Sequence, residues 1–161
     1  MRREWGPVRI LGLGALTVGT LDILDAFVFA GLRGYSPARV LQGIAAGLLG
    51  RASFAGGAAT AVLGGVLHYS IASAVVTVCF LASRRLPLLT RRIALCGPAY
   101  GVLVWIVMNY VVIPLSAITL PPLTIVRLLN GLGIHILGVG TPSALFARAA
   151  LRSRTGPSPA A

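Results

Sequence analysis

Two carboxylates inside a long apolar run constrain this chain more than any other feature. Residues 8–32 are predominantly apolar, and about 20 such residues suffice to cross the hydrocarbon core of a bilayer as a helix. Asp22 and Asp25 lie within this run, and they are two of the chain's three acidic residues. Because a charged side chain is costly in hydrocarbon, an ionisable residue there is a functional hypothesis by default.

Further apolar runs predict that the whole chain is an all-α integral membrane protein. Four runs long enough to span a bilayer are found, at residues 8–32, 54–83, 93–118 and 124–147. They predict a four-helix bundle within a single transmembrane domain, residues 1–147. The composition agrees, with 57% hydrophobic and 11% charged residues. Residues 148–161 are rich in Arg, Ser, Pro and Ala and predict a disordered cytoplasmic tail.

A shorter apolar segment, residues 38–50, predicts an additional helix that does not span the membrane. The segment is too short to cross the hydrocarbon core and is flanked by Arg39 and Arg51. An interfacial helix is favoured, because re-entry would carry Arg51 about 20 Å into the membrane at the helical rise of 1.5 Å per residue. A re-entrant segment is the alternative.

The distribution of arginine predicts the orientation of the chain. Four spans would place both termini on the same side as the loop at residues 84–92. That side would hold Arg2, Arg3, Arg9, Arg84, Arg85, Arg91, Arg92, Arg148, Arg152 and Arg154. The opposite side would hold Arg33, Arg39, Arg51 and Arg127. The positive-inside rule therefore predicts that both termini are cytoplasmic.

The type of basic residue bears on the origin of the chain. All 14 basic residues are Arg, and with the abundance of Ala, Gly and Pro this indicates a bacterial genome rich in G and C. The predicted location is therefore the bacterial inner membrane. The net charge of +11 comes from loops between apolar runs, and no basic face with interleaved aromatic residues remains to bind nucleic acid.

Stripes of small residues predict which polar side chains face the interior of the bundle. Helices in lipid approach closely where Gly and Ala recur on one face, and both histidines lie on such faces. The predicted intramembrane polar cluster comprises Asp22, Asp25, His68, Asn109, Asn130 and His135. At about 1.5 Å per residue, all of them lie between the middle and the outer half of the membrane. Arg33 and Arg127 are predicted at the outer mouth of the cluster.

Several sequence segments together resemble a known family. They are Gly19–Phe27 (GTLDILDAF), Ser36–Gly50 (SPARVLQGIAAGLLG), Leu63–Ala72 (LGGVLHYSIA), Tyr100–Ser116 (YGVLVWIVMNYVVIPLS) and Asn130–Pro142 (NGLGIHILGVGTP). This series is similar to small bacterial inner-membrane proteins of the YagU-like kind. The resemblance implies a four-helix membrane protein, and it transfers neither an activity nor a site residue.

Three functions are compatible with the predicted cluster. The first is a small proton-linked transporter, channel or stress-related membrane protein, which implies a homo-oligomer because one four-helix chain has little room for a pathway. The second is a redox protein in which His68 and His135 ligate haem b. The third is a structural or accessory subunit of another membrane protein, in which the polar residues only hydrogen-bond neighbouring helices.

The sequence favours neither an enzyme nor a bound cofactor. It contains no HExxH motif, no nucleophile elbow and no phosphate-binding loop. No protein metal site is predicted either. Apart from the haem alternative, the expected partners are the lipid bilayer, further copies of the chain or another membrane protein.

Overall fold

The computed structural model describes residues 6–119 and 122–153, and within them it is an all-α bundle. The helices are α1 (Pro7–Gly31), α2 (Pro37–Leu49), η1 (Gly50–Ala55), α3 (Gly57–Arg85), α4 (Leu88–Arg91), α5 (Ile93–Val107), η2 (Met108–Val112), α6 (Ile125–Ile134), η3 (His135–Gly140) and α7 (Thr141–Arg152). η1 is a 3₁₀ helix, and η2 and η3 are π-helical segments. The predicted all-α fold is confirmed.

Among the described residues, four continuous helical stretches are long and apolar enough to cross a membrane. They are Pro7–Gly31, Gly57–Arg85, Ile93–Val112 and Ile125–Arg152. Each carries large apolar side chains on its outer surface, including Leu16, Val28, Val62, Val78, Leu103, Val111, Leu129 and Leu137. An apolar exterior of this extent fits lipid as its solvent. The chain is therefore a multi-pass membrane protein.

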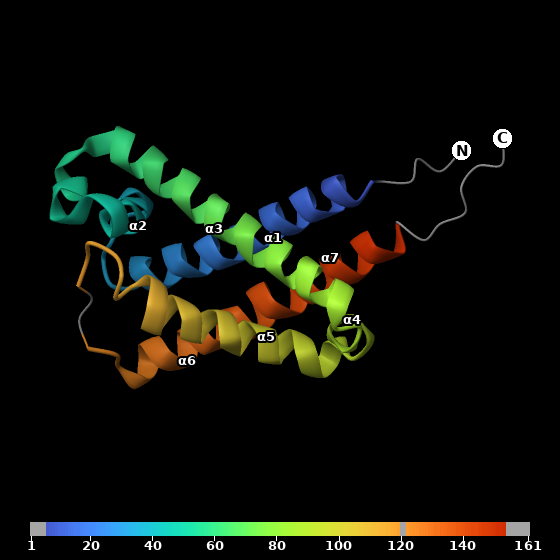
Figure 1. Ribbon diagram of the computed structural model, residues 1–161. Coiled ribbons are helices and arrows are strands. Elements are labelled where there is room, and N and C mark those ends of the chain that lie inside the picture. Colours follow the sequence, from blue (N-terminus) through green and yellow to red (C-terminus); the bar gives the residue numbers. More distant parts are fainter. Residues whose placement is uncertain (1–5, 120–121, 154–161) are drawn as a thin grey trace.

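The ends of the bundle differ in what they carry (Figure 1). One end of the bundle carries the start of α1, the last residues of α7 and the short helix α4. The other end carries α2 and η1. The loop with Arg84, Arg85, Arg91 and Arg92 is thus at the end where the first helix begins and the last one finishes.

Two helix ends differ from the prediction by more than three residues. The third stretch ends at Val112 and not at residue 118, because Pro114 has no N–H and the chain turns after Ile113 donates to the Met108 carbonyl at 2.9 Å. The prediction of a disordered tail from residue 148 is wrong for residues 148–152, which continue α7. They stay helical because Ala150 packs in an apolar cluster with Leu151 against it. Residues 154–161 of the predicted tail lie outside the described residues.

The predicted short helix is α2, and it packs against the first turns of α3. Ser36 caps it by accepting from the Arg39 N–H at 3.2 Å. The Leu41 carbonyl lies so close to Gly64 that a Cβ there would collide with it. Gln42 Nε2 donates to the Gly57 carbonyl at 3.0 Å, so a buried amide joins α2 to the start of α3.

Glycines also bring α5 and η3 into backbone contact. A Cβ on Gly140 would collide with the Gly97 carbonyl and the Gly101 nitrogen, and a Cβ on Gly101 would collide with the His135 carbonyl. Gly97 and Gly101 form a GxxxG pair, the spacing that lets membrane helices approach closely. This crossing fixes the backbone of His135 against α5.

Candidate functional site: an intramembrane aspartate–histidine cavity

Three of the predicted polar residues line one cavity inside the bundle. The cavity has a volume of about 240 Å³, and its ionisable lining residues are Asp22 from α1, His68 from α3 and His135 from η3. The remaining lining side chains are aliphatic or methionine and come from α1, α2, α3, α5, η2 and η3. The ionisable groups therefore share a small space enclosed mainly by apolar walls.

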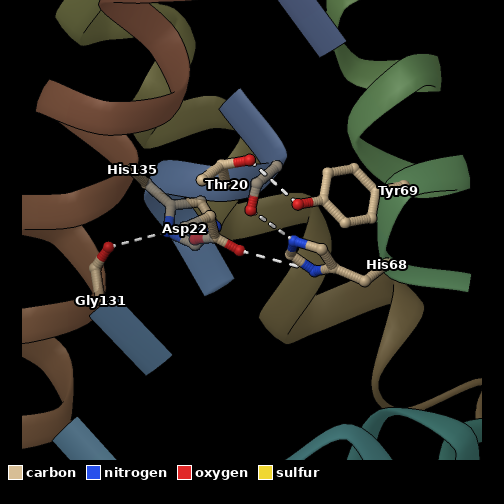
Figure 2. Close-up of polar contacts among 7 residues, drawn as sticks. Thr20, Asp22, His68, Tyr69, Gly131 and His135 are labelled. Atoms are coloured by element: carbon tan, nitrogen blue, oxygen red, sulfur yellow. Dashed lines mark hydrogen bonds and ion pairs between the residues drawn. The ribbon is translucent and has the colours of Figure 1, made fainter. Parts of the chain in front are cut away.

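Hydrogen bonding fixes the orientation of the His68 ring. Its Nε2 lies 2.7 Å from the Gly19 carbonyl, and its Nδ1 lies 4.0 Å from Asp22 Oδ2 (Figure 2). Because a carbonyl can only accept, Nε2 carries a hydrogen in this arrangement. Nδ1 is left facing the carboxylate, with side-chain exposures of 11% for His68 and 29% for Asp22. The nitrogen that can exchange a proton thus points at the acid.

His135 is oriented by the turn that precedes it. Its Nδ1 lies 2.9 Å from the Gly131 carbonyl, so Nδ1 donates and Nε2 is the nitrogen available as an acceptor. Asp22 lies within electrostatic range of both imidazoles, and Figure 2 shows its carboxylate directed at His68. One carboxylate therefore lies in the same cavity as two imidazoles that come from different helices.

A second polar pair, which the sequence did not predict, supports this arrangement. Thr20 Oγ1 and Tyr69 Oη are 3.0 Å apart and join α1 to α3 beside Asp22 and His68 (Figure 2). The Tyr69 ring packs edge-on against the His68 ring, with centroids 5.3 Å apart, and it also contacts Gly19. The sequence held one indication of this pair, since Thr20 and Tyr69 each lie within two positions of a predicted site residue.

Asp25 is one turn from Asp22 but points at a different helix. Its Oδ2 accepts a hydrogen bond from Asn130 Nδ2 on α6 at 2.7 Å. Neither residue lines the cavity. Successive helical residues are about 100° apart, so three positions turn Asp25 away from the direction of Asp22 by about 60°. Asp25 and Asn130 thus form a helix-to-helix clamp beside the cavity.

The remaining predicted residues lie toward the end of the bundle that carries α2. Asn109 donates to the Trp105 carbonyl of its own helix at 2.9 Å and lines a separate pocket of about 460 Å³ with Arg127. Arg33 donates to the Phe29 carbonyl at 2.6 Å and lies over the Phe29 ring. The structure therefore divides the predicted cluster into a cavity, a clamp and an outer group.

A haem does not fit between the two histidines. The cavity has a volume of about 240 Å³ between lining side chains such as Val104 and Met108, and a porphyrin is much larger than this space. His68 Nε2 is already hydrogen-bonded to the Gly19 carbonyl. Within residues 6–119 and 122–153, no group of three or more His, Cys, Asp or Glu side chains is arranged to hold a metal ion.

Comparisons with known proteins add no identity to this site. No family model, no curated protein and no solved structure matches the chain. The YagU-like resemblance of the sequence accordingly stays a prediction.

Proposed function

We propose that this protein is a small proton-linked transporter or channel of the bacterial inner membrane, and not an enzyme. Asp22, His68 and His135 hold the proton in the interior of the bundle. The observation that supports the proposal most directly is the 4.0 Å approach of His68 Nδ1 to the Asp22 carboxylate, in a cavity that is apolar apart from these two residues and His135. Ionisable groups at such a position are costly, and in membrane proteins they commonly mark proton or ion pathways.

The geometry supplies the elements of a proton relay. A protonated Asp22 can give its proton to His68 Nδ1, which leaves a carboxylate and an imidazolium and conserves charge overall. The Gly19 carbonyl holds the other hydrogen of His68 in place, so the exchange is confined to Nδ1. His135 Nε2 offers a second acceptor in the same cavity. The cavity volume of about 240 Å³ leaves room for water between these groups, because a water molecule occupies about 30 Å³.

The proposed orientation places both the N-terminus and the C-terminus in the cytoplasm. It is supported by the Arg-rich loop between α3 and α5, which lies at the end where α1 begins and α7 finishes. Positively charged short loops favour the cytoplasmic side. A homo-oligomer belongs to the same proposal, because the one cavity that contains both histidines is small.

Reconstitution of the purified protein tests this function directly. Liposomes containing a pH-sensitive dye are prepared with and without the protein, and a potassium gradient with valinomycin drives proton entry. We expect acidification of the lumen to be faster with the protein than in empty liposomes made from the same lipid. Equal rates in both preparations, at confirmed protein incorporation, contradict the proposal.

A further inference from the structure

A cavity larger than the aspartate–histidine cavity lies elsewhere in the described part of the chain. It is an open groove of about 710 Å³ between α2, α3 and the segment from Met108 to Ile118. Its size is within the range of about 300–1,000 Å³ that is typical of ligand sites. It lies at the end of the bundle that carries α2, opposite the end with α4 (Figure 1).

The groove is mostly apolar, and one charged residue lines it. Leu48, Leu67, Ile71 and Val112 are among the side chains that line it, and Arg39 is the charged one. The Arg39 guanidinium lies 3.9 Å from the centroid of the Phe54 ring, which also lines the groove. No described lining residue is acidic. Arg39 is exposed, so a positive charge stands where the groove meets the exterior.

We propose that this groove binds one acyl chain of an anionic phospholipid from the surrounding bilayer, with the phosphate of the headgroup on Arg39. An acyl chain matches the apolar walls, and a phosphate oxygen matches the guanidinium, which binds phosphate through paired, charge-assisted hydrogen bonds. The proposal concerns a second site and does not depend on proton movement through the first.

The apolar walls of the groove and Arg39 contribute to lipid binding in different ways. A lipid chain that enters it from the membrane gains little hydrophobic free energy, because the hydrocarbon is as apolar as the walls. Shape therefore determines whether a chain is held, while Arg39 determines which headgroup is preferred. The groove and the aspartate–histidine cavity share Val40, Ile44, Ile71 and Met108, so a bound chain would lie against the wall of the first site.

Two pairs of variants separate acyl-chain binding by the walls from headgroup preference by Arg39. Gly43 lines the groove, and a Cβ added there meets no atom within 4 Å, so Gly43→Phe fills the groove without a backbone collision. Gly12→Phe is the matched control, because Gly12 is exposed, equally open and outside the groove. Arg39→Gln removes the charge, and Arg51→Gln removes an exposed charge that does not line the groove.

Native mass spectrometry of the full-length protein measures the bound lipid. The protein is released from nanodiscs that contain equal amounts of phosphatidylglycerol and phosphatidylcholine with identical acyl chains, and oleate is added in a separate arm. We expect wild type, Gly12→Phe and Arg51→Gln to retain one phosphatidylglycerol. We expect Gly43→Phe to retain neither lipid. We expect Arg39→Gln to show a ratio of bound phosphatidylglycerol to bound phosphatidylcholine about tenfold lower than that of wild type.

Several results overturn the assignment. Equal retention of the two phospholipids by wild type removes the role of Arg39. Retention by Gly43→Phe at the wild-type level places the lipid elsewhere on the protein. Displacement of phosphatidylglycerol by an equal amount of oleate assigns the groove to a free fatty acid and not to a bilayer lipid.

Discussion

The Asp22→Asn protein is expected to fold and insert normally but to lose proton movement in liposomes down to the level of empty vesicles. Asparagine has nearly the shape of aspartate, and the hydrogen bond that orients His68 goes to the Gly19 carbonyl and not to Asp22. The substitution therefore removes the group that exchanges a proton with His68 Nδ1 while leaving the walls of the cavity in place. The measurement is the initial rate of acidification in dye-containing proteoliposomes.

Asp25→Asn is the matched control, because it makes the same chemical change one helical turn away. Asparagine at this position keeps a carbonyl oxygen that can accept the hydrogen bond from Asn130 Nδ2, and position 25 does not line the cavity. We expect its rate of acidification to be that of wild type. Wild-type rates in Asp22→Asn, or equal losses in both variants at equal incorporation, contradict the assignment of Asp22 as the proton-holding acid.

The Gly140→Leu protein is expected to be the least stable of the single substitutions considered. A Cβ at this position would collide with the backbone of α5 at Gly97 and Gly101, and neither atom can move without shifting a whole helix. Overpacking typically costs 1–3 kcal/mol. Because backbone yields less than side chains do, we expect a loss of about 3 kcal/mol or more in the free energy of unfolding. Size-exclusion chromatography after stepwise heating in detergent measures the temperature at which the monodisperse protein is lost.

Gly133→Leu provides the comparison for this substitution. Gly133 lies in α6, and a Cβ added there meets no atom within 4 Å. We expect little change in its melting temperature, since leucine also has the higher helix propensity. Equal melting temperatures for Gly140→Leu and wild type would falsify the close crossing of α5 and η3, and with it the placement of the His135 backbone.

Hydropathy alone predicts the helices of this fold well, because the length of an apolar run reports what a bilayer requires. The described helices begin close to the predicted positions, and α2 matches the predicted short helix to within one residue at each end. The errors occur where side-chain packing or a missing backbone N–H determines where a helix ends. Pro114 ends the third stretch early, and contacts of Ala150 extend the last helix beyond its apolar run.

The rotation of each helix about its axis was harder to predict than the residues at which the helix begins and ends. The Leu41 carbonyl contacts Gly64, whereas a Cβ on the adjacent Gly65 meets no atom within 4 Å. Adjacent residues differ by about 100° around a helix, so an error of one position points to another neighbour. For the same reason, the pairing of Asp25 with Asn130 was not predicted.

The central claim, that Asp22 faces an imidazole nitrogen of His68 inside the bundle, is tested most directly by ¹⁵N NMR of histidine-labelled protein in micelles. The chain has two histidines, so each ring nitrogen is assigned by comparing wild type with His68→Gln. We predict that His68 carries hydrogen on Nε2, that Asp22→Asn shifts its Nδ1 resonance, and that Asp25→Asn does not. A His68 without hydrogen on Nε2, or an Nδ1 resonance unchanged by Asp22→Asn, contradicts the account.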